Sequence, residues 1–208
     1  MLRIKICGLT TPQDAQAAIA LGADALGFNF FPGSRRYLPL AARDWIGGLP
    51  KSVERIAIVV NPTFEDARAA AAVPGIDALQ LHGSETPDFC RRLKKGGIRF
   101  EKAIPVGGGE SLTAVPDFFT DTLLLDSARP GEFGGSGRTF PWELARDFVT
   151  ANSRLRVVLA GGLRPENVAD AVTLVRPFGV DVTTGVESSP GRKDYQLLQA
   201  FITAARGR

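Results

Sequence analysis

Short apolar runs alternate with alanine-rich segments of helical periodicity along the whole chain. Each run spans four to six residues and stops at a glycine or a polar residue, which is typical of buried strands. The predicted strands are Arg3–Cys7, Ala25–Asn29, Arg55–Val60, Ala78–Leu81, Phe100–Ile104, Thr122–Leu125, Arg156–Ala160 and Val180–Thr183. The pattern therefore predicts eight strands.

The segments between these strands place apolar residues on one face of a helix. Some begin with Thr-Pro and some end in glycine, which are signals for the start and the end of a helix. The predicted helical segments are TPQDAQAAIALG, TFEDARAAAAV, TPDFCRRLKKG, PWELARDFV, RPENVADAVTLV and KDYQLLQAFITAA.

A weak internal repeat supports this alternation. It reads GADALGFNF from Gly22, GIDALQLHG from Gly75 and GVDVTTGVE from Gly179. In each copy we expect the glycine to end a helix in a left-handed conformation and a strand to follow the aspartate.

Alternating strands and helices predict an α/β fold with a parallel sheet and right-handed crossovers. Eight units favour a closed (β/α)8 TIM barrel, and an open doubly wound sheet is the alternative. The 208 residues leave 26 per unit, so we expect one barrel domain over residues 1–208. Its active site is expected at the C-terminal ends of the strands.

Composition excludes several classes of partner. The net charge is +3, and the 25 basic residues are scattered among 22 acidic ones, so nucleic-acid binding is not favoured. We find neither a signal peptide nor an apolar stretch near the ~18 residues of a membrane span, which predicts a cytoplasmic protein without a membrane partner.

The few histidines and cysteines exclude most metal sites. There is one histidine, and the two cysteines, Cys7 and Cys90, lack CxxC spacing. We therefore expect no metal and two free thiols. Cys90 lies in a helical pattern and is predicted to be a core residue.

Reactive residues gather at the predicted strand ends. Cys7 and Asp126 can form a base and acid pair if one substrate reaches both, although a core thiol and a turn-capping aspartate are the structural alternatives. Glycines and hydroxyls after the last two strands are suited to holding a phosphate through backbone N–H groups. These residues are Gly161, Gly162, Thr183, Thr184 and Gly185.

Eight motifs are spread along the whole chain. In order, they are KICGLT, GADALGFNFFPGSRRYL, VVNPTF, LQLHG, LLLDS, GGSGRTFPW, LAGGLRPENV and VDVTTGVESSPGRKD. Together they resemble the phosphoribosylanthranilate isomerase family of tryptophan biosynthesis. The resemblance implies a (β/α)8 barrel that needs no cofactor and no metal. It also implies an Amadori rearrangement of N-(5-phosphoribosyl)anthranilate to 1-(2-carboxyphenylamino)-1-deoxyribulose 5-phosphate.

The resemblance also implies roles for single residues. Cys7 matches the general base, Asp126 the general acid, and Arg36 the partner of the anthranilate carboxylate. His82 and Asp181 match positions near the substrate, although Asp181 can equally be the repeat's aspartate before a strand. We further hypothesise that positive charge from Arg36 or from helix N-termini favours the Cys7 thiolate.

The sequence departs from the family pattern in three places. Thr183 and Thr184 replace two serines, Pro141 replaces an aspartate but suits a helix start, and Arg35 replaces a proline. Because Arg35 is a second arginine beside Arg36, either of them can pair with the anthranilate carboxylate.

Two other functions fit part of the sequence. One is another phosphosugar enzyme, such as an epimerase or synthase, that shares only the phosphate loops. The other is a catalytically silent barrel that binds a phosphorylated ligand or a protein. The oligomeric state is expected to be a monomer or a homodimer.

Overall fold

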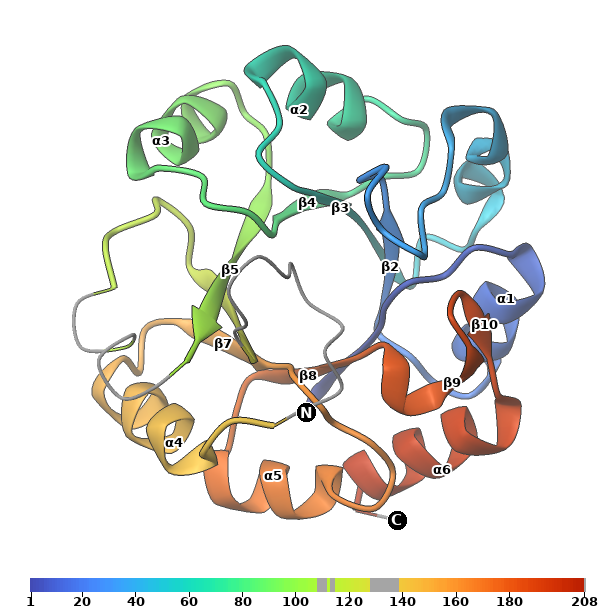
Figure 1. Cartoon of the computed structure of the whole chain (residues 1–208), viewed down its shortest axis with the longest axis vertical. Coiled ribbons are helices and arrows are strands. Elements are labelled where there is room, and N and C mark those ends of the chain that lie inside the picture. The colour runs from blue at the N-terminus through green and yellow to red at the C-terminus, as the bar shows by residue number, and fades with distance from the viewer. Residues whose placement is uncertain (108–111, 113–114, 128–138, 208) are drawn as a thin grey trace.

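The chain forms a closed barrel of eight parallel strands in sequential order, with β1 paired to β8 (Figure 1). The computed structural model describes residues 1–107, 112, 115–127 and 139–207. The barrel prediction is confirmed, and the open doubly wound sheet is wrong. The strands are β1 (Arg3–Ile6), β2 (Ala25–Asn29), β3 (Glu54–Val59), β4 (Ala78–Leu81), β5 (Phe100–Val106), β6 (Thr122–Ser127), β7 (Arg156–Leu159) and β8 (Gly179–Val182).

Helices cover the outside of the barrel, and each predicted helical segment overlaps one of them. Thr11, Thr63 and Thr86 cap three of them by accepting a backbone N–H of the first turn, as N-cap side chains do. Pro141 directly precedes another, as expected. The helices are α1 (Pro12–Ala20), α2 (Phe64–Ala71), α3 (Pro87–Lys95), α4 (Trp142–Ala151), α5 (Val168–Val175) and α6 (Tyr195–Ala205).

The connection from β2 to β3 differs from the connections that contain α1 to α5. It contains two short 3-10 helices, η1 (Leu40–Ala42) and η2 (Asp44–Gly48), and no α-helix. Within it, Arg36 and Leu38 are buried while Arg35 is exposed. Of the GGSGRTFPW motif, residues 134–138 lie outside the described residues.

The internal repeat is fully correct only at Gly22, because Gly75 is left-handed but lies beyond Ala72, the C-cap of α2. Gly22 and Gly75 have positive φ angles of 96° and 89°. Gly179 does not, because Arg176 already takes the left-handed conformation at the end of α5. Gly179 lies within β8, where a Cβ would be 2.7 Å from the backbone oxygen of Arg3. The prediction for Gly179 was therefore wrong.

The barrel interior has a polar side and an apolar side. Lys5, Gln80, Glu101 and Asp181 are buried charged or polar residues from β1, β4, β5 and β8. A separate buried cluster holds Ala103, Leu124, Val158 and Ala160. Burying the four polar residues costs free energy unless their charges are paired. Lys5 provides this pairing, because it contacts the other three residues.

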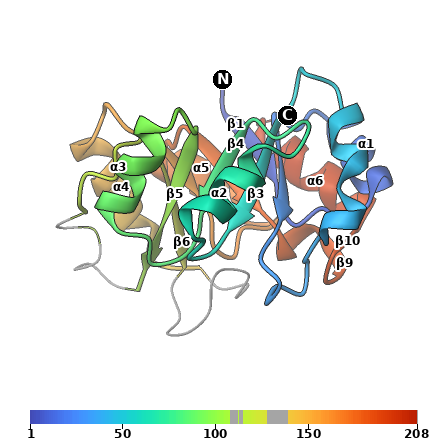
Figure 2. The same cartoon turned by 90° about the horizontal axis from the view of Figure 1, so that it is seen from above.

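Figure 2 shows both termini at one end of the barrel. The hairpin of β9 (Glu187–Ser189) and β10 (Arg192–Lys193) lies at the opposite end, beyond the C-terminal end of β8. Among the described residues, no helix is long and apolar enough to cross a membrane.

Candidate active site

Cys7 follows β1 at the C-terminal end of the barrel. Its backbone N–H donates to Val182 of β8, and the residue is only 8% exposed. The neighbouring strand leaves room for the thiol because a Cβ on Gly27 would lie 2.8 Å from the Cys7 sulfur. A glycine is therefore required beside the thiol at this point of β2.

Lys193 is a site residue that the sequence did not reveal. Its buried ammonium donates to the carbonyl oxygens of Cys7, at 2.6 Å, and of Thr183, at 3.2 Å. It also pairs with Glu187 at 3.2 Å. One cation thus joins the ends of β1 and β8. The only signal was its place in the SSPGRKD segment, where a lysine reads as a surface residue.

Two lysines control the charge around the thiol. Burial raises the pKa of Cys7 above its ordinary value, while Lys5, Lys193 and a hydrogen bond from Thr183 lower it. Arg36 also attracts the Cys7 thiolate, so Lys5 and Lys193 add to the positive charge expected from Arg36, and the contribution of helix N-termini stays a prediction.

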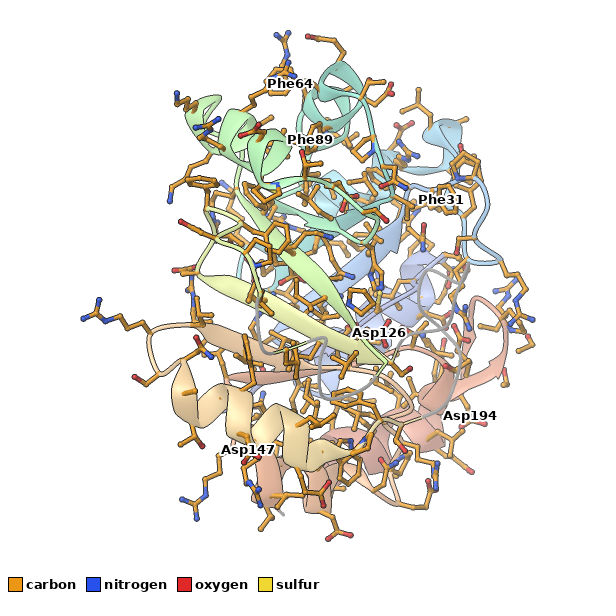
Figure 3. The ribbon with its side chains drawn as sticks, turned by 60° about the vertical axis from the view of Figure 1, so that its left-hand side comes forward. Phe31, Phe64, Phe89, Asp126, Asp147 and Asp194 are labelled. Carbon is orange, nitrogen blue, oxygen red and sulfur yellow. The ribbon has the colours of Figure 1, made fainter. Side chains whose placement is uncertain are left out.

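Asp126 lies near the C-terminal end of β6 (Figure 3). It contacts His82, which follows β4. His82 Nε2 is 3.1 Å from Asp126 Oδ2. The other carboxylate oxygen accepts the backbone N–H of Ser127 at 2.8 Å. Both oxygens of Asp126 therefore have a hydrogen-bonding partner, which orients the carboxyl group.

Arg36 is held by Glu187. Its Nε and Nη2 donate to the Glu187 carboxylate at 2.8 and 2.6 Å. Burial raises the pKa of Glu187, but Arg36 and Lys193 lower it more, so it stays below its ordinary value. Arg36 Nη1 donates no hydrogen bond to a described residue. The sequence did not identify Glu187 as a site residue.

Asp181 lies in the barrel interior. Its carboxylate accepts a hydrogen bond from Lys5 at 2.9 Å, and it is the third residue of β8. The matching aspartates of the repeat, Asp24 and Asp77, precede their strands and accept the backbone N–H groups of Ile4 and Arg55. Asp181 therefore does not serve as the aspartate before a strand.

The two glycine-containing loops lie against each other. Gly161 and Gly162 follow β7 with φ angles of 82° and 64°, and their N–H groups donate no hydrogen bond to a described residue. Gly185 lies in the 3-10 helix η4 (Thr184–Val186), where a Cβ would be 2.0 Å from the Leu163 oxygen. This close approach holds the loops after β7 and β8 against each other.

The described part of the chain contains no group of three or more His, Cys, Asp or Glu that could hold a metal ion. The mouth instead combines a thiol, a carboxyl, an arginine and a glycine-rich backbone. Such a set is suited to proton transfer on an anionic substrate.

Comparison with known proteins identifies this arrangement. Residues 4–204 match the sequence model of the family described as N-(5'-phosphoribosyl)anthranilate (PRA) isomerase. The chain belongs to the phosphoribosylanthranilate isomerase family. Like its relatives, this member is an enzyme, and it catalyses an isomerase step of tryptophan biosynthesis.

Individual phosphoribosylanthranilate isomerases are similar over their whole length. The enzyme of Geobacter sp. (strain M21) is 45% identical over 207 residues, which cover 99% of this chain and 98% of that protein. A solved phosphoribosylanthranilate isomerase in complex with reduced 1-(o-carboxyphenylamino)-1-deoxyribulose 5-phosphate has a TM-score of 0.85 and 36% identity, covering 100% of both chains. Monomers generated from the dimeric enzyme of Thermotoga maritima give a TM-score of 0.84 and 36% identity, also covering 100% of both chains.

Proposed function

We propose that Cys7 and Asp126 are the general base and the general acid of an Amadori rearrangement of N-(5-phosphoribosyl)anthranilate. The observation that carries this proposal is that a thiol and an oriented carboxyl, from β1 and β6, lie at the same end of one barrel. General acid–base catalysis needs two such groups within reach of one substrate. The product is 1-(2-carboxyphenylamino)-1-deoxyribulose 5-phosphate.

The reaction begins at the furanose ring. Asp126 gives its proton to the ring oxygen, the C1–O bond breaks, and the nitrogen lone pair forms a protonated Schiff base with C1. The Cys7 thiolate then takes the proton from C2, and the electron pair of that C–H bond forms the C1–C2 double bond of an enolamine. Tautomerisation moves a proton from the C2 hydroxyl to C1 and gives the ketone.

The anionic ends of the substrate are assigned to two separate groups. We assign the phosphate to the N–H groups around Gly161, Gly162, Thr184 and Gly185, with the Thr183 hydroxyl beside them. The carboxylate is assigned to Arg36, because Glu187 orients its guanidinium and leaves Nη1 for another acceptor. Exposed Arg35 has no comparable support.

His82 and Asp181 stay assigned to positions near the substrate, and each contacts another residue of the site. His82 touches Asp126, and Asp181 holds Lys5. We further assign the reaction to one barrel domain in the cytoplasm, where Cys7 and Cys90 stay reduced.

The experiment is a fluorescence assay of phosphoribosylanthranilate turnover. Cys7→Ala and Asp126→Asn are each expected to lower kcat by about 100-fold or more. Two control variants make the same chemical changes away from the site. Cys90→Ala removes a buried thiol from α3, and Asp170→Asn neutralises an exposed carboxylate of α5. Both should keep near-normal turnover. Full activity of either site variant would refute its assigned role.

A further inference from the structure

A buried chain of polar side chains runs from the barrel core to Asp126. The Lys5 ammonium donates to Asp181 Oδ1 at 2.9 Å and to Gln80 Oε1 at 2.7 Å. Gln80 Nε2 is 2.5 Å from His82 Nδ1, and His82 Nε2 is 3.1 Å from Asp126 Oδ2. Three consecutive contacts therefore connect Lys5 to Asp126: Lys5 to Gln80, Gln80 to His82, and His82 to Asp126.

The direction of each hydrogen bond follows from chemistry. An ammonium group only donates, so the Gln80 atom beside Lys5 must be the carbonyl oxygen. The amide NH2 of Gln80 then faces His82, and it donates to a lone pair on Nδ1. The neutral ring consequently carries its proton on Nε2, the nitrogen that faces Asp126.

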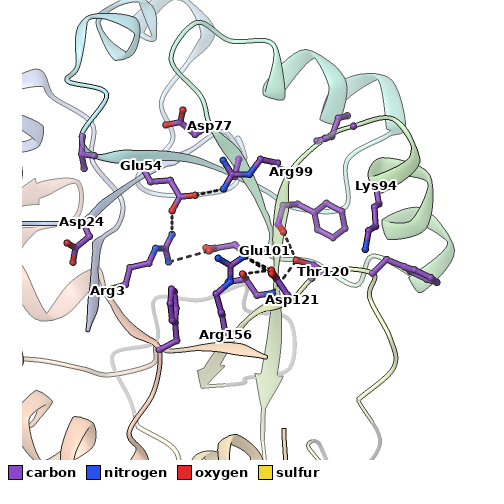
Figure 4. A pocket seen from close by; sticks show the side chains of 18 of the residues that line it. Arg3, Asp24, Glu54, Asp77, Lys94, Arg99, Glu101, Thr120, Asp121 and Arg156 are labelled. Atoms are coloured by element: carbon purple, nitrogen blue, oxygen red, sulfur yellow. Dashed lines mark hydrogen bonds and ion pairs between the residues drawn. The ribbon is translucent and has the colours of Figure 1, made fainter. Parts of the chain in front are cut away.

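Lys5 is itself held in place from both ends of the barrel. It is 0% exposed, and Glu101 Oε1 lies 4.0 Å from its nitrogen. Figure 4 shows that Glu101 continues through Arg3 to Glu54 and Arg99 at the other end of the barrel, where the first two contacts measure 3.5 and 2.7 Å. These pairs keep Lys5 charged and leave Gln80 no freedom to turn its amide.

We propose that Lys5, acting through Gln80, fixes His82 as the Nε2–H tautomer that donates a hydrogen bond to Asp126. The doubly protonated ring is disfavoured because an N–H on Nδ1 would face the Gln80 NH2, donor against donor. His82 therefore stays neutral, and the proton that is transferred in the reaction is carried by Asp126. When Asp126 gives that proton to the sugar, the His82 N–H stabilises the carboxylate that forms.

Lys5, Gln80 and His82 are thus positioning residues, and their role rests on Asp126 being the general acid of the proposed function. The chain offers a direct readout because His82 is its only histidine. A nitrogen-15 NMR spectrum of the labelled enzyme therefore reports the ring of His82 without assignment. It needs no substrate and no turnover.

Gln80→Glu is the decisive variant. A carboxylate at this position can still accept from Lys5, but it also accepts from Nδ1, so we expect His82 to become protonated on Nδ1. We expect kcat to fall about 10-fold to 100-fold, the range of a misdirected acid–base group, while KM changes little. Gln199→Glu makes the same change on the exposed face of α6 and should leave both the spectrum and kcat unchanged.

Each result has one reading. The proposed control of the His82 tautomer is refuted if the unmodified enzyme shows a proton on Nδ1, or if Gln80→Glu leaves Nδ1 unprotonated. A changed tautomer with unchanged kcat overturns its role in catalysis. Full activity of Asp126→Asn would instead refute the proposed acid, whatever the spectrum shows, so the two failures are distinguishable.

Discussion

The Lys193 ammonium donates a 2.6 Å hydrogen bond to the backbone carbonyl oxygen of Cys7. This contact joins two residues that are 186 positions apart in the sequence. It fixes the backbone of the proposed base, and the same cation favours the thiolate form of that base. Lys193 therefore acts on both the position and the protonation of Cys7.

Replacing Lys193 with methionine removes the charge and keeps the approximate length of the side chain. The pKa of Cys7 should rise further, because burial already raises it and a lowering cation is lost. Since the base acts as thiolate, the rise of kcat/KM with pH should move to higher pH. The measurement is a pH profile of kcat/KM for both proteins.

Lys193→Arg is the control, because it keeps the charge and alters only the geometry. Its pH profile should stay nearer to that of the unmodified enzyme, even where its kcat is reduced. An unmoved profile in Lys193→Met would show that this cation does not influence the base.

Gly185→Ala tests the contact between the two glycine-containing loops. The new Cβ would lie 2.0 Å from the Leu163 oxygen, so the loops must separate. We expect a loss of about 1–3 kcal/mol in the free energy of unfolding. KM should rise about 10-fold or more as hydrogen bonds to the phosphate are lost.

The matched control is Gly48→Ala. Gly48 lies in η2, and a Cβ there would have no heavy atom within 4 Å. Stability should be measured by urea unfolding and KM by steady-state kinetics. Equal effects of the two substitutions would contradict the steric explanation.

Cys90 makes stability depend on pH in the alkaline range. Burial raises its pKa to about 11 in the folded protein, against about 8.5 in an unfolded chain. Between these values only the unfolded chain ionises, so stability falls as pH rises. By pH 10 the loss should reach about 2 kcal/mol.

Cys90→Ala isolates this contribution from those of other groups. The variant should be less stable than the unmodified protein near neutral pH, and the difference should shrink toward pH 10. Urea unfolding at several pH values measures both curves. A difference that stays constant with pH would exclude Cys90 as its source.

The sequence could predict the strands because strand periodicity is a local property. The alternation around Arg3–Cys7 and Ala25–Asn29 is complete within a few residues, and it places Cys7 and Asp126 at strand ends. Barrel closure then follows from the number of units. The rim residues were consequently predictable without coordinates.

The partners of those residues could not be predicted in the same way. Lys5 and Asp181 are 176 positions apart, and the pattern around Lys5 reads only as one polar residue within a strand. Glu187 and Lys193 read as charges in a surface loop until β9 and β10 fold back over Cys7 and Arg36. Such pairs depend on tertiary packing, which no local pattern encodes.

The helix-free connection from β2 to β3 suggests where new substrate preferences could be engineered. It carries Arg36 on a turn whose neighbours Pro32, Gly33 and Arg35 are exposed, while buried Phe30 and Leu38 fix its two ends. A combinatorial library at the three exposed positions would reshape the rim beside the guanidinium without unpacking an amphipathic helix. Selection from such a library could retune the enzyme toward amino sugars with a different aglycone while the proton-transfer machinery stays intact.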